Sequence, residues 1–472
     1  MADLDYAKYI SELVARARKA AAVAENFTQE QVDELCEAIA WNCVQSPFKE
    51  DCARLLVEES RMGVFENKVT KIENKVRGVW RDMKGQKSVG LVEDNKALGI
   101  KKYAKPMGVI GAVMPCTNGE ATPMCKAMFA IKSRNAIIFS AHPRARKTAV
   151  LVADLIRKVL KKYGAPEDLV IAIDPEYVSV EASAELMKQC DFLMATGGTP
   201  MVRSAYSSGT PAIGVGTGNV VSIIDGTTDL NKVAEMIVAS KANDNATSCS
   251  TENNIVVLES CYDEFIKAMA AHGAVLFKEG SEEREKIIHT LWPNTPADHV
   301  LNRDIVAKSA KEIAAYAGVA VPENTKVIMC EENGGFGNEY PLTGEKLSPV
   351  SGVRKVKTFE QALDACDAIL HYQGLGHSCG IHSSNEAHIE AVSLRMKVCK
   401  VVVNAPQSLT NSGSWTSGYP MSLTLGCGTW GHNSISWNAT WKDLLNYTFV
   451  SYPIPNTKPS DEELFDGRTF EL

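Results

Sequence analysis

The sequence predicts an α/β fold with two doubly wound domains, on the basis of chain length, continuous apolar strands and the helical segments between them. At 472 residues the chain is too long for one hydrophobic core, so two or three domains are expected. Helical patterns such as 122–133 and 146–163 fill most gaps between short apolar runs. These runs are 107–114, 136–139, 169–173, 192–195 and 220–224. Continuous apolar strands that alternate with helices indicate a parallel sheet covered on both faces.

The N-terminal part of the chain is predicted to be helical, with a hairpin between it and the first sheet. Thr28 and Gln31 fit a capping box, in which each side chain bonds the other residue's backbone N–H, so a helix is expected to begin there. Charged helical segments continue to about residue 82, and the weak alternation over 88–104 predicts a β-hairpin.

A second α/β pattern follows a predicted helix at 231–242. Its strands are expected near 254–258, 326–330, 350–356, 378–382 and 401–404. Residues 405–436 are rich in Ser, Thr and Gly, and a loop of that length in a compact domain is usually functional. These patterns predict a first domain over residues 1–230, a second over 231–425 and a C-terminal return over 426–472.

Charge and cysteine content narrow the class of protein. The net charge of −7 argues against nucleic acid or an anionic membrane as the main partner. No apolar run approaches the roughly 18 residues of a membrane span, and the acidic start of the chain differs from a basic signal peptide. The 13 cysteines are odd in number and include no Cys-x-x-Cys pair, which predicts free thiols and a cytoplasmic location.

Cys249 is the strongest candidate for chemistry. It lies on a short polar loop between a helix that ends near residue 240 and the strand predicted at 254–258, where a thiol would be exposed and held by backbone. Core cysteines more often lie inside apolar runs, as Cys330 does. Because free cysteine is among the most buried residue types, Cys249 alone would more often be structural, and its role depends on other segments.

Five further segments lie at predicted strand ends or on polar loops, namely 114–120, 139–147, 195–200, 214–219 and 340–350. In the first, Asn118 can offer its amide to a developing oxyanion, although an Asn-Gly turn alone is the commoner role. The second is a basic cluster that suits a ribose or phosphate; its alternative is a solvated helix start, where cations oppose the helix dipole. The third is a glycine-rich turn that suits a phosphate but lacks the spacing of the dinucleotide fingerprint.

The order of these segments around Cys249 resembles the aldehyde dehydrogenase superfamily, specifically its CoA-acylating branch. The resemblance covers nearly the whole chain and is most specific over residues 132–139, 345–350 and 425–431. It implies an aldehyde dehydrogenase-like fold with a nucleotide-binding domain, a catalytic domain that carries the thiol, and a β-strand arm that builds homodimers or homotetramers. The hairpin at 88–104 would be that arm, paired with strands near the C-terminus.

The resemblance also implies roles for individual residues. Cys249 matches the nucleophile, which would form a thiohemiacetal with the aldehyde and, after hydride transfer to NAD or NADP, a thioester. Asn118 and the Cys249 backbone N–H would hold the oxyanion, and Glu345 would bind the nicotinamide ribose. Ala145, which lies amid basic neighbours where many NAD-using relatives have glutamate, leaves NAD versus NADP open. The other implied cofactor-binding residues are Thr117, His142, Pro143, Arg144, Thr196, Gly197, Gly198, Thr199, Gly216 and Gly218.

One departure from the superfamily points to CoA. Hydrolytic members carry a glutamate that activates water in the segment equivalent to 215–219, whereas this chain has no acid between Gly214 and Ile224. A general base must reach its proton within hydrogen-bond distance, so water attack on the thioester should be slow. A thiol is partly ionised near neutral pH and can release the acyl group without a protein base, so CoA is expected as the cosubstrate.

Hydroxyl and amide donors near Cys249 favour a small polar or anionic aldehyde. Sulfoacetaldehyde and succinate semialdehyde are the leading candidates, ahead of acetaldehyde and propanal. Against this, Glu120 adds an acid beside Asn118, no pocket arginine is evident, and Thr247 and Ser248 could simply satisfy a turn. The candidate substrate contacts are Thr247, Ser248, Ser250, His377, Ser408 and Thr410.

Two rival functions are a hydrolytic dehydrogenase that releases free acid and a catalytically silent structural homologue. The joint presence of Cys249, Asn118 and Glu345 argues against the silent homologue. The histidines between 371 and 388 do not repeat at helical metal-ligand spacing, so no metal site is expected. The expected partners are therefore a small aldehyde, CoA and further copies of the chain, with no nucleic acid and no membrane.

Overall fold

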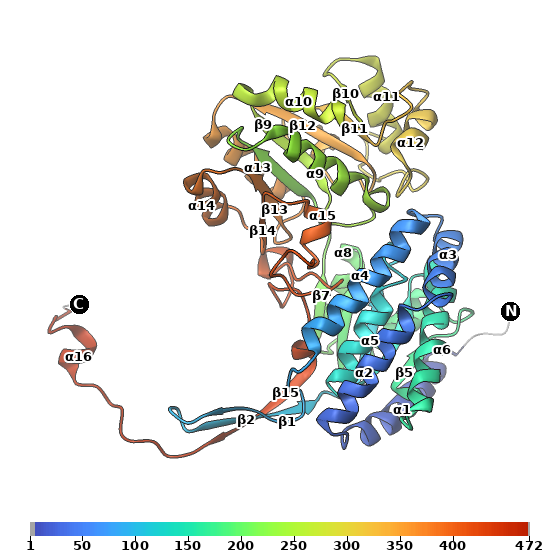
Figure 1. The fold of residues 1–472 in the computed structure, drawn as a ribbon, viewed down its shortest axis with the longest axis vertical. Coiled ribbons are helices and arrows are strands. Elements are labelled where there is room, and N and C mark those ends of the chain that lie inside the picture. Colours follow the sequence, from blue (N-terminus) through green and yellow to red (C-terminus); the bar gives the residue numbers. More distant parts are fainter. Residues whose placement is uncertain (1–4, 471–472) are drawn as a thin grey trace.

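The structure is a computed structural model that describes residues 5–470, and it consists of two α/β bodies with a separate three-stranded sheet (Figure 1). One body contains a five-stranded sheet and the N-terminal helices, and the other contains a seven-stranded sheet. The expected architecture of two doubly wound domains with a strand arm is therefore confirmed. Among residues 5–470, no helix combines the length and apolarity that crossing a bilayer requires.

The five-stranded sheet is parallel and has the order β5-β4-β3-β6-β7. Its strands are β3 (Val109–Met114), β4 (Ala136–Ala141), β5 (Val170–Ala172), β6 (Phe192–Thr196) and β7 (Ala212–Val215), with helices α5 (Thr122–Lys132), α6 (Arg146–Lys162), α7 (Val180–Gln189) and α8 (Thr199–Tyr206) between them. Every residue of β3 and β4 is buried, as their continuous apolar sequences predict. The chain reverses its direction across the sheet between β3 and β6, where such sheets bind ligands.

Four N-terminal helices complete this body. They are α1 (Tyr6–Ala24), α2 (Gln29–Cys43), α3 (Phe48–Ser60) and α4 (Phe65–Met83). The predicted capping box at the start of α2 is present, since Thr28 Oγ1 accepts from Gln31 N and Gln31 Oε1 accepts from Thr28 N. Helix α4 matters most for function, because one of its faces reaches the junction between the two bodies.

The seven-stranded sheet is also parallel and has the order β10-β11-β12-β9-β8-β13-β14. Its strands are β8 (Val220–Ile224), β9 (Glu252–Leu258), β10 (Ala274–Phe277), β11 (Val327–Glu331), β12 (Val350–Val356), β13 (Cys379–His382) and β14 (Val401–Val403). The helices of this body are α9 (Leu230–Ala242), α10 (Tyr262–Ala271), α11 (Glu282–Leu291), α12 (Ala310–Ala317), α13 (Phe359–Tyr372), α14 (Glu386–Arg395) and α15 (Gln407–Thr410).

The chain passes from the five-stranded sheet to the seven-stranded sheet before residue 230, where the domain boundary was expected. Strand β8 was expected to end the first domain, but it pairs with β9 and β13 in the seven-stranded sheet. A short run of buried apolar residues fits either sheet, so its sequence does not identify its neighbours. The four-residue strands β7 and β10 were not predicted, because each is too short to show a periodicity.

The third sheet contains β1 (Gly90–Asn95), β2 (Ile100–Pro106) and β15 (Leu445–Ser451), all antiparallel. It confirms the predicted hairpin and its pairing with a strand near the C-terminus. The arm and the tail that carries α16 (Asp461–Phe465) extend away from both bodies (Figure 1). Their apolar side chains are exposed, with Phe449 at 63% and Tyr452 at 50%.

Candidate active site

A cleft of about 550 Å³ lies at the junction of the two bodies. The carboxyl ends of β3, β4, β6 and β7 form one wall, as expected for a doubly wound sheet. Helix α4, the loop before β9 and the loop after β14 form the other wall. Sequence-predicted residues that line this cleft are Thr117, Asn118, His142, Pro143, Thr196, Gly197, Gly198, Gly216, Thr247, Ser248, Cys249, Glu345 and Ser408.

The Cys249 thiol is paired with a histidine. Its Sγ lies 3.1 Å from His377 Nε2, and His377 Nδ1 lies 2.8 Å from Ser378 Oγ. His377 is fully buried and is not among the residues that line the cleft, although it was predicted as a substrate contact. A weak nucleophile is activated when a base lies within hydrogen-bond distance of it and a third group orients that base.

Burial keeps both partners neutral. It raises the pKa of the Cys249 thiol to about 12, with the neighbouring Glu345 and Cys427 adding to the rise. Burial lowers the pKa of His377 to about 3, and the charge of Lys400 lowers it further. The resting pair is therefore a thiol and a neutral imidazole, which is the form of histidine that accepts a proton.

Asn118 lies on the turn between β3 and α5. Its backbone oxygen accepts from Thr122 N at 3.0 Å, so the turn also starts the helix. Its side-chain Oδ1 accepts from Lys71 Nζ at 2.7 Å. Because a lysine can only donate, this contact identifies the oxygen of the amide and leaves the NH₂ as the end that can serve a substrate.

The phosphate-binding turn is open to the cleft. Gly197 and Gly198 line it, and a Cβ built on either residue would meet nothing closer than 3.6 Å and 3.8 Å, respectively. Gly198 is the N-cap of α8 and no side chain caps that helix. Pro200 has no N–H and Met201 N donates to Gly198 O at 3.0 Å, so the N–H groups of Gly198 and Thr199 are the ones open to an anion. The turn therefore fits the pyrophosphate of a dinucleotide.

Glu345 is the one acidic side chain among the lining residues of the cleft in the described part of the chain. Burial raises its pKa to about 8, although Lys241 and Lys346 oppose this effect. Its backbone N–H donates to Gln373 Oε1 at 2.8 Å, which fixes the residue at the cleft wall. A partly protonated carboxyl group can both accept from and donate to ribose hydroxyls.

Apart from His377, five predicted site residues do not line the main cleft. Thr199 lines an adjoining cavity with Gly216, and the Arg144 side chain is exposed outside both cavities. Gly218 packs against the nucleophile, since a Cβ there would lie 2.0 Å from Cys249 O. Ser250 is buried and bonds Ser248 Oγ at 3.0 Å, and Thr410 also lies outside the cleft.

The basic cluster at residues 142–147 is explained by a carboxylate from another helix. Glu59 of α3 accepts from Lys147 N at 2.8 Å and from Thr148 N at 3.1 Å, so an acid caps the start of α6 despite its cations. Ala145 is buried in a small apolar cluster with Leu56 and does not face the cleft, so its lack of charge says nothing about the choice between NAD and NADP.

Sequence reasoning missed Lys71, Lys75 and Asp244. Lys71 and Lys75 line the cleft from α4, and Asp244 lies in the turn that leads to Cys249. The available signal was the placement of lysines at helical spacing beside the apolar Ile72, which puts charges next to the buried face of α4. Predicting their partners would have required knowing that α4 meets the loop at residue 244.

Comparisons with known proteins show which sequences and structures this chain is similar to. A sequence model described as the aldehyde dehydrogenase family matches residues 5–435. The acylating sulfoacetaldehyde dehydrogenase of Bilophila wadsworthia is 42% identical, with 97% of this chain and 98% of that protein covered. The acetylating succinate-semialdehyde dehydrogenase of Clostridium kluyveri is 40% identical, with 97% and 98% covered. The crystal structure of an acetylating aldehyde dehydrogenase from Geobacillus thermoglucosidasius matches with a TM-score of 0.91 at 33% identity, covering 97% of this chain and 99% of that one.

Proposed function

This chain belongs to the aldehyde dehydrogenase family, and on that premise we propose that it converts a short anionic aldehyde and CoA to the acyl-CoA with NAD or NADP. The observation that carries the proposal is the Cys249–His377 pair, which lies beside a cleft that Asn118 and an open phosphate-binding turn also line. Relatives that cover almost all of this chain and carry acylating or acetylating names support the same reaction class.

The residues divide the reaction between them. Cys249 Sγ attacks the aldehyde carbon while His377 Nε2 accepts the thiol proton, and the Asn118 amide donates to the developing oxyanion. The nicotinamide cofactor, when bound, accepts hydride. After His377 has passed its proton to solvent, it can accept the proton of the incoming thiol that releases the acyl group from Cys249.

Residues for the cofactor are present on both sides of the cleft. The backbone N–H groups of Gly198 and Thr199 would hold the pyrophosphate, and Glu345 would accept hydrogen bonds from the hydroxyls of the nicotinamide ribose. His142 and Pro143, at the end of β4, would lie beside the adenosine. Gly197 and Gly198 have no side chains and no close neighbours, which leaves room for a ligand to approach the backbone.

Release by a thiol in place of water is supported by the loop beside Cys249. Gly216 and Thr217 line the cleft, and Gly218 packs directly against the nucleophile, so no carboxylate occupies this segment. Water would have to be activated by Glu345 or by His377. A thiol needs less help, because a fraction of it is ionised near neutral pH.

A cation in the cleft favours an anionic aldehyde. Lys75 Nζ donates to the backbone oxygens of Ser412 at 3.1 Å and Gly413 at 2.7 Å, and within residues 5–470 it has no carboxylate at ion-pair distance. Burial lowers the pKa of Lys75 to about 8, so the group is mostly charged at neutral pH. A buried charge without a counterion is costly, and the carboxylate or sulfonate of a substrate would neutralise it.

The position of Lys75 suits the far end of a short substrate. Residues four apart on a helix lie on the same face, so Lys75 is one turn beyond Lys71, which contacts Asn118. An aldehyde held between Cys249 and Asn118 would therefore direct its tail along α4. This lysine takes the place of the pocket arginine that the sequence did not supply.

The reaction class is tested by measuring NAD(P)H formation with and without CoA. We expect sustained turnover with CoA, and without it a burst of about one NAD(P)H per active site. Equal steady-state rates in both conditions would contradict the acylating proposal and favour a hydrolytic enzyme. No reduction with any short aldehyde would favour the silent homologue.

The substrate class is tested with Lys75→Gln. We expect KM for sulfoacetaldehyde and succinate semialdehyde to rise about 10-fold, equal to about 1.4 kcal/mol, with little change for propanal. Wild-type KM for the charged aldehydes should also rise as the pH passes about 8, because Lys75 then loses its charge. Arg77→Gln is the matched control, since Arg77 lies on the exposed side of the same helix. An equal effect on propanal would contradict the proposal.

We also propose that the arm builds a homo-oligomer. Strands β1 and β15 form open edges of the three-stranded sheet, and open edges pair with other chains unless they are covered. The exposed Phe449 would become buried in such an assembly. Light scattering of Phe449→Glu should give a smaller particle than the wild type; an unchanged mass would contradict an interface at this residue.

A further inference from the structure

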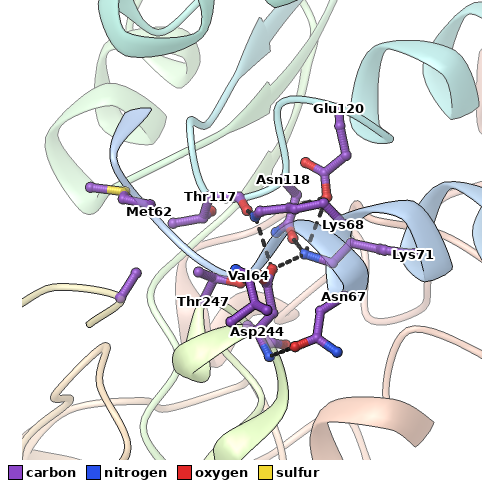
Figure 2. Close-up of polar contacts among 12 residues, drawn as sticks. Met62, Val64, Asn67, Lys68, Lys71, Thr117, Asn118, Glu120, Asp244 and Thr247 are labelled. Carbon is purple, nitrogen blue, oxygen red and sulfur yellow. Dashed lines mark hydrogen bonds and ion pairs between the residues drawn. The ribbon is translucent and has the colours of Figure 1, made fainter. Parts of the chain in front are cut away.

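Four charged side chains connect the oxyanion residue to the nucleophile loop, of which three are buried and Lys71 is partly exposed to the cleft. Lys68 and Lys71 extend from α4 toward Asp244 and Glu120 (Figure 2). Lys68 Nζ lies 2.8 Å and Lys71 Nζ 2.6 Å from Asp244 Oδ2. Lys71 Nζ also lies 3.3 Å from Glu120 Oε1. Two cations and two anions balance, so Glu120 introduces no net charge beside Asn118.

Lys71 is the member that touches both catalytic segments. Its Nζ donates to Asn118 Oδ1 at 2.7 Å and to Asp244 Oδ2 at 2.6 Å (Figure 2). Asp244 Oδ2 in turn accepts from Thr247 Oγ1 at 2.6 Å, two residues before Cys249. One ammonium group therefore links the oxyanion donor and the nucleophile loop through hydrogen bonds.

The nucleophile loop needs such support because its backbone is strained. Asp244, Asn245 and Ala246 have φ angles of 51°, 50° and 59°, so three consecutive residues with a Cβ adopt the left-handed conformation. Each such residue costs about 1 to 3 kcal/mol and persists only where its surroundings hold it. The turn is held at its first residue, since Asp244 Oδ1 accepts from Val64 N at 2.8 Å and Asp244 N donates to Asn67 Oδ1 at 3.0 Å.

Lys71 also determines which end of the Asn118 amide faces the substrate. An amide can rotate by half a turn and present either oxygen or nitrogen, and only the nitrogen can donate to an oxyanion. With Lys71 on Oδ1, the flipped amide would place its NH₂ against an ammonium group, where two donors face each other. The ion pair with Asp244 keeps Lys71 in place for this contact.

We propose that Lys71 is a positioning residue, which fixes the amide of Asn118 for the oxyanion and couples it through Asp244 to the strained turn before Cys249. This inference rests on the proposed function, because it concerns how fast Cys249 is acylated. It differs from the role of Lys75, which concerns only the charge of the substrate. Lys71 has its own charge neutralised by Asp244 and Glu120, so it contributes little net attraction for an anion.

The test is a double-mutant cycle between Lys71→Met and Asn118→Ala. The readout is the rate of the NAD(P)H burst without CoA, measured with saturating propanal so that substrate charge plays no part. We expect Lys71→Met to lower this rate about 10- to 100-fold in the wild type, with KM changed less than about threefold, because one oxyanion donor is worth about 10²- to 10³-fold. In the Asn118→Ala background the same change should lower the rate less than about threefold.

Two variants separate positioning from a general loss of structure. Lys132→Met removes a buried lysine that pairs with Asp33 at the far end of α5, so it should lower Tm without changing the burst rate. Lys71→Arg keeps a cationic donor and should recover part of the lost rate. If Lys71→Met unfolds the protein, the cycle is run with Lys71→Arg and Lys71→Gln instead.

Equal rate losses from the Lys71 substitutions with and without Asn118 would overturn the inference, because the lysine would then act independently of the amide. A change confined to charged aldehydes would also overturn it and make Lys71 an anion receptor. Failure of the proposed function is distinguishable, since a wild-type protein without any burst would show no rate to compare.

Discussion

The two walls of the cleft are built in opposite ways. The wall from the five-stranded sheet presents open backbone at Gly197 and Gly198, with no charged side chain at the turn itself. The facing wall holds Cys249 on a loop that begins with three left-handed residues and is held by buried ion pairs with α4. The first wall suits a ligand that must bind and leave, and the second suits atoms that must stay in place during reaction.

This difference shows which groups position a bound ligand and which position the reacting atoms. Backbone N–H groups at a helix start bind any phosphate and depend little on side-chain identity. The nucleophile and its base must be aligned with the oxyanion donor to within a fraction of an ångström, so their supports are side chains with fixed partners. Asn118 follows β3 on the first wall, but its side chain is held by Lys71 of the second. Substitutions should therefore have large effects on kcat at the second wall and modest effects on KM at the first.

The largest effect is expected for Cys249→Ala. Removing the nucleophile should lower kcat at least about 10³-fold, because no other group can hold the acyl intermediate. Cys399→Ser is the matched control, since Cys399 is the other partly exposed thiol among the thirteen. If most turnover survived in Cys249→Ala, the assignment of the nucleophile would be wrong.

His377→Ala should follow, with a loss of about 10²- to 10⁴-fold in kcat/KM for the aldehyde. The pH profile identifies its role. With the pKa of His377 near 3 and that of the thiol near 12, wild-type kcat/KM for the uncharged propanal should stay flat from pH 6 to 9, because the neutral imidazole is present throughout. A tenfold rise per pH unit would instead indicate that a preformed thiolate reacts and that His377 is not the base.

Asp244→Asn should mainly affect stability, by about 3 to 5 kcal/mol in the free energy of unfolding, because it leaves Lys68 and Lys71 with Glu120 as their one remaining carboxylate partner. Burial alone would raise the pKa of Asp244, but Lys71 and Lys68 outweigh burial and hold it at about 2. Its ionised form is therefore favoured by folding, and this stabilisation is present above about pH 4 and is lost as the pH falls toward 2.

The acid sensitivity can be measured by thermal unfolding between pH 2.5 and 7. The wild-type Tm should fall more steeply below pH 4 than that of Asp244→Asn, whose amide does not titrate. Asp33→Asn removes the partner of Lys132 at a more exposed position and should have a smaller effect on Tm at pH 7. Parallel curves for wild type and Asp244→Asn would show that Asp244 does not carry this stabilisation.

The smallest effect is expected at the nucleotide wall. Gly198→Ala adds a methyl group that meets no protein atom within 3.4 Å, so we expect a rise of about 3- to 10-fold in KM for the nicotinamide cofactor and an unchanged Tm. Gly218→Ala is the matched comparison, because its Cβ would lie 2.0 Å from Cys249 O and should lower kcat instead. If both glycine substitutions changed the same kinetic constant, the proposed difference between the two walls would be contradicted.

Local sequence was enough for the elements that have a strong pattern. The capping box at Thr28 and the buried strands β3 and β4 match their predicted positions, because these signals act between residues close in the chain. The membership of β8 in the seven-stranded sheet was not predictable in this way, since pairing is a contact between distant segments. For the same reason the sequence did not predict that Glu59 caps the start of α6.

The sequence by itself determined the α/β architecture and the family, and it predicted Cys249 as the nucleophile and Asn118 as the oxyanion donor, because these follow from residue types in a fixed order along the chain. Only the tertiary structure decided that His377 is the partner of the thiol and that Lys71 and Asp244 hold the two reacting segments. The separations are 128 residues for Cys249–His377 and 173 for Lys71–Asp244. Coulomb and hydrogen-bond energies depend on distance in space, so such partners are known only once the chain has folded.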